Sequence, residues 1–162
     1  STSHLTGQLF ATMSGASLVH VPYKGEGPAL TDLMAGRIDL FFGNISAVLK
    51  LRDSGKVRIM AVADEARTAI APDISSAAEA GFPGFTSNAW FALMAPPGTP
   101  APIVGKLNEA LAAILADEGV KKRFLALGAE AKPATPAQAR AFIDAERGRW
   151  KQVIVEAGVT MD

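Results

Sequence analysis

Apolar positions follow two kinds of spacing in turn, which predict helices alternating with strands. Helical spacing, with Ser, Thr or Pro at the start or Gly at the end, predicts helices at 3–14, 28–35, 45–54, 75–80, 100–116, 117–127 and 136–157. Short apolar runs predict strands at 17–23, 37–43, 57–63 and 129–134, with a long extended stretch at 85–96. The alternation up to about residue 85 predicts the α/β class, with a parallel sheet covered by helices on both faces. Because the chain then turns mostly helical, we expect it to change lobe near Trp90.

Composition limits the classes of partner. The 162 residues suffice for one domain or two small lobes, and 16 basic residues balance 16 acidic ones. No charge run exceeds Lys121-Lys122-Arg123, so the charge gives no reason to expect binding to nucleic acid or to a membrane surface. The absence of cysteine excludes disulfides, thiolate metal sites and thiol catalysis. No apolar run approaches the roughly 20 residues of a membrane span.

Motifs for catalysis are missing. His4 and His20 are isolated and lack metal-site spacing, so we interpret both as structural. No G-x-S-x-G elbow or Walker loop occurs, and the Gly-Glu-Gly at 25–27 lacks the third glycine of a dinucleotide fingerprint. We therefore predict no catalytic residue, no metal and no cofactor, and hence no enzyme.

Three junctions where a strand leads into a helix are candidates for binding an anion. Backbone N–H groups at a helix N-terminus and the positive end of the helix dipole attract negative charge. In open α/β sheets, such junctions gather outside the carboxyl ends of the strands. The predicted carboxylate ligands are Ser1, Thr2, Ser3, Lys24, Gly25 and Asn44. The alternative, that each junction is only a turn and a cap, stays open at this point.

Several spaced words in the chain resemble one family. They include "SHL" before a helix, "HVPYKG-x-GPAL-x-DL-x-x-G-x-ID", "EAGFPGF" and "W-x-x-x-x-APPGTP". Together, from Ser1 to Asp162, they resemble the Bug (TctC) family, the extracytoplasmic solute receptors of tripartite tricarboxylate transporters. Ser3 replaces the usual threonine before the histidine, and "ISS" at 74–76 replaces the usual "VPT".

The resemblance implies a two-lobed periplasmic binding protein type II fold with Rossmann-like lobes. Family chains are nearly twice this long, so we expect an incomplete C-terminal portion. Residues 1–87 would form most of the second ligand-binding lobe, 88–95 a crossing strand and hinge, and 96–162 the part that completes the first lobe. The loop that grips a carboxylate in this lobe would end at Ser1, Thr2 and Ser3.

The implied function is that of a periplasmic receptor. It would capture a small carboxylate by lobe closure and deliver it to the membrane components of the transporter, as a monomer when full-length. The isolated chain would associate or swap elements, because deleting strands exposes sheet edges. Trp90 would line the cleft or pack the crossing strand. Two alternatives stay open: the effector-binding domain of a transcriptional regulator, and a small α/β enzyme.

Overall fold

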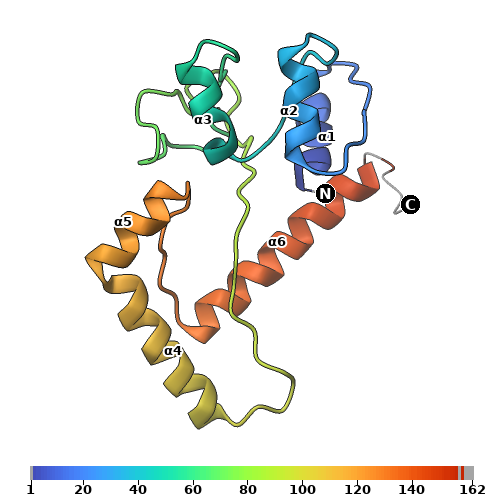
Figure 1. Cartoon of the computed structure of the whole chain (residues 1–162). Coiled ribbons are helices and arrows are strands. Elements are labelled where there is room, and N and C mark those ends of the chain that lie inside the picture. Colours follow the sequence, from blue (N-terminus) through green and yellow to red (C-terminus); the bar gives the residue numbers. More distant parts are fainter. Residues whose placement is uncertain (1, 157, 159–162) are drawn as a thin grey trace. The chain divides into compact units, whose positions relative to one another are not determined.

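The computed structural model describes residues 2–156 and 158, and in that part six helices are joined by long extended segments (Figure 1). The helices are α1 (Thr2–Ser14), α2 (Glu26–Met34), α3 (Ile45–Asp53), α4 (Ala101–Ala116), α5 (Glu118–Ala126) and α6 (Pro136–Glu156). All but one of the predicted helices are thus confirmed, with ends that differ from the prediction by at most two residues. None of the helices in the described part has both the length and the apolar character that crossing a bilayer requires.

The chain divides into two compact units. The first unit comprises Ser1–Ala89 and Val153–Asp162, and the second comprises Trp90–Gln152. Helix α6 begins in the second unit and ends in the first. The assignment of 1–87, 88–95 and 96–162 to lobes and hinge stays a prediction.

The first unit is built around an aromatic cluster. The ring of Phe10 on α1 lies 5.6 Å from Phe42, 5.4 Å from Phe82 and 5.7 Å from Phe85, measured between centroids. Phe85 is only 7 % exposed. Tilted and edge-on aromatic pairs of this kind add to the free energy gained by burying the rings. The cluster therefore holds α1 against segments that lie far apart in the sequence.

The prediction of hydrogen-bonded strands is wrong for the described residues. The segments at 17–23, 37–43, 85–96 and 129–134 contain no assigned strand, and one isolated parallel bridge joins Val62, in the segment 57–63, to Ser76. A strand is stabilised by a neighbouring backbone about 4.8 Å away, whatever its own propensity. Several of their apolar side chains stay uncovered: Val19 is 88 % exposed and Phe91 96 %. These segments thus have the residue composition of strands but lack the hydrogen bonds between neighbouring backbones that make a sheet.

The short helix predicted at 75–80 is also wrong, because the segment forms turns instead. Its start is nevertheless a capping box: Ser76 N donates to Glu79 Oε2 at 2.8 Å, and Glu79 N donates to Ser76 Oγ at 3.2 Å. Gly81 then adopts a φ of 92°, outside the helical range. The cap is present, but the chain leaves the helical path after one turn.

Helix caps organise the second unit. Asp117 is the N-cap of α5 and accepts a hydrogen bond from Val120 N at 2.9 Å. The predicted cap at Thr135 is confirmed, because Gln138 N donates to Thr135 Oγ1 at 3.2 Å while Thr135 N donates to Gln138 Oε1 at 2.9 Å. None of the residues 90–152 is buried. Local hydrogen bonds, and not a core, thus define this unit.

Candidate functional site

The first predicted junction is the N-terminal turn of α1. Thr2 begins the helix and is exposed, and Ser3 is half-buried. Ser1, the first predicted ligand, lies outside the described residues. The first N–H groups of a helix have no acceptor within the helix, so this turn presents donors to an anion. The hydroxyl of Thr6, one turn further on, donates to the carbonyl of Thr2 at 2.8 Å.

The two histidines stack on each other next to this turn. The rings of His4 on α1 and His20 in the following extended segment lie 3.8 Å apart and 7° from parallel. His4 Nε2 also lies 3.4 Å from Gln8 Nε2. Partial burial, and secondarily the charge on His20, lowers the pKa of His4. The stack therefore ties the start of α1 to the segment that leads to Lys24.

The second junction is the loop before α2. Gly25 is the N-cap of α2, with φ 107° and ψ 175°. Only glycine adopts this combination without strain. Lys24 is exposed, and no hydrogen bond or ion pair joins it to another described residue. The loop thus offers a backbone fixed by glycine and a solvated ammonium group.

A hydrogen bond between Tyr23 and Asp32 connects the residue before the Lys24-Gly25 loop to the helix after it. Tyr23 donates through its hydroxyl to Asp32 Oδ2 at 2.9 Å, and Arg37 Nη1 donates to Asp32 Oδ1 at 2.8 Å. The hydrogen bond from Arg37, followed by that from Tyr23, lowers the pKa of Asp32. Asp32 lies on α2, so the residue before Lys24 is anchored to the helix that the loop precedes.

The third junction already holds a carboxylate of the protein itself. Asn44 is the N-cap of α3, and Glu26 Oε1 accepts hydrogen bonds from its backbone N at 3.1 Å and from its Nδ2 at 2.8 Å. Glu26 lies in the first turn of α2. The amide groups of Asn44 are therefore engaged in the absence of any ligand. Glu26 also brings a negative charge into the region where the sequence predicts an anion.

Two contacts thus connect the predicted ligands. The His4–His20 stack joins the turn with Thr2 and Ser3 to the segment that carries Lys24, and Glu26 joins the Lys24-Gly25 loop to Asn44. Sequence reasoning missed Glu26. The available signal was its place in the first turn of a helix, where acidic side chains are favoured by the helix dipole.

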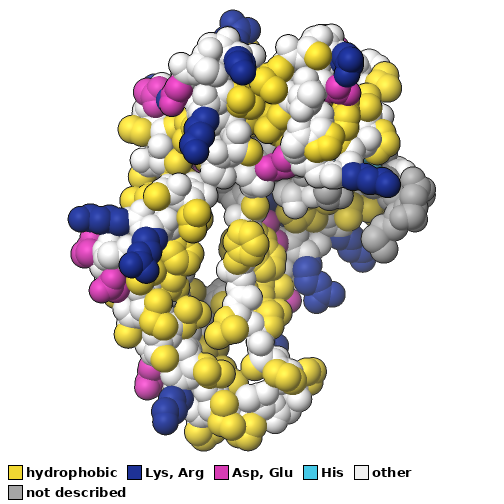
Figure 2. Space-filling model, in the orientation of Figure 1, with side chains coloured by type: hydrophobic (Ala, Val, Ile, Leu, Met, Phe, Trp, Pro, Cys, Tyr) yellow, Lys and Arg dark blue, Asp and Glu magenta, His cyan; other side chains and the backbone are white. Residues whose placement is uncertain are grey.

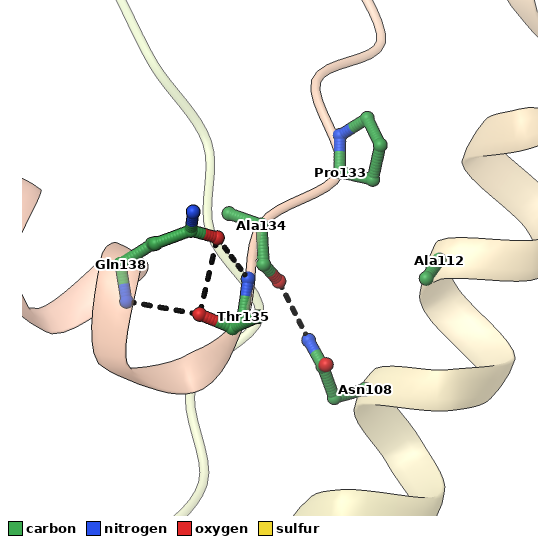
Figure 3. Close-up of a pocket in the computed structure, with 6 residues that line it drawn as sticks. All are labelled: Asn108, Ala112, Pro133, Ala134, Thr135 and Gln138. Atoms are coloured by element: carbon green, nitrogen blue, oxygen red, sulfur yellow. Dashed lines mark hydrogen bonds between the residues drawn. The ribbon is translucent and has the colours of Figure 1, made fainter.

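A shallow pocket of about 200 Å³ lies in the second unit, away from any predicted ligand in the sequence (Figure 3). Asn108 Nδ2 donates to the carbonyl of Ala134 at 2.8 Å, and Thr135 and Gln138 cap α6. These polar groups already have hydrogen-bond partners inside the protein. We therefore interpret the pocket as the packing contact between α4 and the start of α6, and not as a ligand site. No sequence pattern marks this pocket, because it depends on a hydrogen bond between Asn108 and Ala134, which lie 26 residues apart. Its lining consists of Asn108, Ala112, Pro133, Ala134, Thr135 and Gln138.

Solved structures define the class of protein. The chain superimposes on R. palustris Rpa4515, solved with adipate, with a TM-score of 0.84, 38 % identity and coverage of 99 % of this chain and 54 % of that one. It matches MatC from Rhodopseudomonas palustris, solved with bound malate, with a TM-score of 0.77, 35 % identity and coverage of 95 % and 53 %. It matches the periplasmic binding protein BugD with a TM-score of 0.76 at 34 % identity, covering 99 % and 54 %. The chain thus has the α/β fold of periplasmic solute-binding proteins, as predicted, over about half of that fold.

Sequence relatives give the family. The model of the TctC family, "Tripartite tricarboxylate transporter family receptor", matches residues 1–159, and the chain belongs to this family. Protein BugT of Bordetella pertussis is 38 % identical over 161 residues, which are 99 % of this chain and 49 % of the relative. A protein of Agrobacterium vitis is 42 % identical over 159 residues, 96 % of this chain and 46 % of the relative. The chain therefore spans about half the length of these relatives.

Proposed function

We propose that the whole protein is a periplasmic receptor that binds a small carboxylate for a tripartite tricarboxylate transporter. The observation that carries this proposal is the likeness over 99 % of the chain to a protein solved with adipate. The malate bound to a second similar protein supports the same ligand class. Binding without bond-making accords with a chain in which we predict no catalytic residue.

The proposed contacts are those of the three junctions. The first turn of α1, with Ser1, Thr2 and Ser3, would donate backbone N–H groups and hydroxyls to one carboxylate. Lys24 would attract the anion electrostatically, and Gly25 would let the backbone approach it. Asn44 would take part only when the ligand carboxylate replaces that of Glu26, which now accepts its two hydrogen bonds.

The proposed mechanism is capture by closure. Each lobe would contribute contacts, with 1–87 and 96–162 belonging to different lobes and 88–95 to the hinge. A ligand that contacts both lobes only in the closed state shifts the equilibrium by its difference in affinity for the two states. The closed form would then be recognised by the membrane components of the transporter.

Thermal-shift screening and calorimetry of the whole protein against a carboxylate panel test the proposal. The panel includes adipate and malate, with the uncharged diamides of both acids as controls. A ligand present at 100 times its Kd stabilises the folded state by about 2.7 kcal/mol, so one or more acids should raise the melting temperature while the diamides do not. A protein that binds none of the acids, or binds diamides equally well, contradicts the proposal.

A further inference from the structure

A buried hydroxyl lies behind the first turn of α1. Thr6 is only 6 % exposed, and its Oγ1 donates to the carbonyl of Thr2 at 2.8 Å. The same oxygen lies 2.5 Å from Oγ of the half-buried Ser87, 81 residues further along the chain. Because the two side chains are so far apart in the sequence, the tertiary structure must bring them together.

The direction of this relay follows from counting protons. A hydroxyl has one proton to donate, and a carbonyl oxygen only accepts. Because Thr6 gives its proton to the carbonyl of Thr2, the proton between the two hydroxyls comes from Ser87. The relay therefore runs from Ser87 O–H to Thr6 O–H to the Thr2 carbonyl.

The relay ends on the peptide that carries the Ser3 N–H group. A peptide unit is planar, so the carbonyl of Thr2 and the N–H of Ser3 are fixed together and point in opposite directions. Fixing the carbonyl toward Thr6 thus fixes the N–H toward the open end of the helix. Chains of hydrogen bonds also polarise one another, which makes that N–H a stronger donor.

Ser87 is in turn anchored to a third segment. Its backbone N donates to the carbonyl of Ala63 at 2.9 Å, and the neighbouring Asn88 donates through Nδ2 to Asp64 Oδ2 at 3.0 Å. Ala89, two residues after Ser87, is the last residue of the first unit before the chain enters the second. The relay thus connects the first turn of α1 to the segment that leads out of the first unit.

We propose that Thr6 and Ser87 are positioning residues of the carboxylate site. They aim the Ser3 N–H at the ligand and couple its orientation to the segment that leaves the first unit. This inference rests on the proposed function, because it assumes that the first turn of α1 binds the carboxylate.

The test measures Kd for adipate and malate, by calorimetry on the folded whole protein, in Thr6→Val, Ser87→Ala and the double variant. A neutral hydrogen bond contributes an amount equivalent to about a three- to tenfold change in an equilibrium constant. We expect Thr6→Val to weaken binding by about that factor and Ser87→Ala by less. The double variant should be no weaker than Thr6→Val, because both changes break one relay.

Two control variants separate positioning from stability. Thr6→Ser keeps the hydroxyl and should retain wild-type affinity. Ser14→Ala removes a similar bond at the other end of α1, where Ser14 Oγ donates to the carbonyl of Phe10 at 2.7 Å, and should leave Kd unchanged. Should Thr6→Val not fold, Ser87→Ala decides alone, because it leaves the bond from Thr6 to Thr2 in place.

Three outcomes overturn the inference. The first is a set of variants with lower melting temperatures and unchanged Kd, which would make the relay purely structural. The second is an equal loss of affinity in Thr6→Ser and Thr6→Val, and the third is additive losses in the double variant. A wild-type protein that binds none of the acids overturns the proposed function as well, so the two failures are distinguishable.

Discussion

The two units have equally regular helices but differ in burial. In the first unit, Phe10 packs against three other aromatic rings, and Leu30 and Phe85 are less than 9 % exposed. In the second, none of the residues 90–152 is buried, although α4 is more apolar in composition than the three helices α1, α2 and α3 of the first unit. Caps and periodicity therefore produce helices in both units, while a core forms only where distant segments meet.

The second unit exposes side chains that ordinarily lie inside a protein. On α4, Ile103 is 51 % exposed, Leu107 47 % and Ile114 54 %, and apolar side chains are widely exposed in the space-filling view (Figure 2). Burying one such side chain fully contributes about 1.5–3 kcal/mol. These side chains thus give the second unit an apolar surface that is available for association.

The largest expected effect is the loss of the first unit's core. Phe10→Ala removes the central, half-buried ring of the aromatic cluster and should lower the free energy of unfolding by about 2–3 kcal/mol, less than a fully buried ring would. The matched change in the second unit is Phe142→Ala, which removes a ring that is 48 % exposed and packs edge-on against Trp90 at 5.6 Å. It should cost about 1 kcal/mol. Urea denaturation of the 162-residue chain measures both, and equal losses would refute the contrast between the units.

A second test concerns the uncovered surface. The 162-residue chain by itself should form dimers or larger species at micromolar concentration, because exposed apolar side chains and unpaired extended segments associate. Light scattering after size exclusion measures the mass. Phe91→Asp, at a side chain that is 96 % exposed, should shift the chain toward monomer, whereas Glu109→Asp should not. A monomeric wild-type chain would show that the second unit needs no cover.

The sequence predicted the features that depend on neighbours within one turn. The cap at Thr135 and the C-terminal end of α4 follow from local residue types, and they match the structure. The strand predictions were wrong because a strand needs hydrogen bonds to a neighbouring backbone. The residue types in 17–23 and 85–96 favour an extended conformation but do not provide that neighbour.

The candidate site shows the same limit. The turn with Thr2 and the glycine at 25 could be predicted from helix signals and conformational preference. The bond from Asn44 to Glu26 joins residues 18 apart, and the pair of Thr6 and Ser87 joins residues 81 apart. Nothing in one sequence marks such pairs, because Ser, Thr, Asn and Glu are also common as solvated side chains.

A smaller effect separates backbone strain from packing in the loop before α2. Gly25→Ala forces a side chain into φ 107°, a region reserved for glycine, and should lower the free energy of unfolding by about 1–3 kcal/mol. Gly27→Ala, two residues on in the helix, meets no atom within 4 Å and should raise it by about 0.5–1 kcal/mol. Thermal denaturation of both variants gives the comparison. The same sign for both would mean that packing, and not the backbone conformation, governs this loop.

The smallest expected effect is a pH dependence confined to the first unit, since both histidines, His4 and His20, lie there. Partial burial, and then the charge on His20, lowers the pKa of His4 below its unfolded value, so the folded state binds fewer protons than the unfolded chain. The stability that this difference provides is complete above about pH 6.5 and is lost as the pH falls through the lower, folded value. Urea denaturation at pH 7.5 and 5.5 should show lower stability at pH 5.5, and the difference should shrink in His20→Gln, which removes the stacked ring. Higher stability at pH 5.5 would mean that the folded protein favours the charged form of His4, which would contradict the lowered pKa of His4.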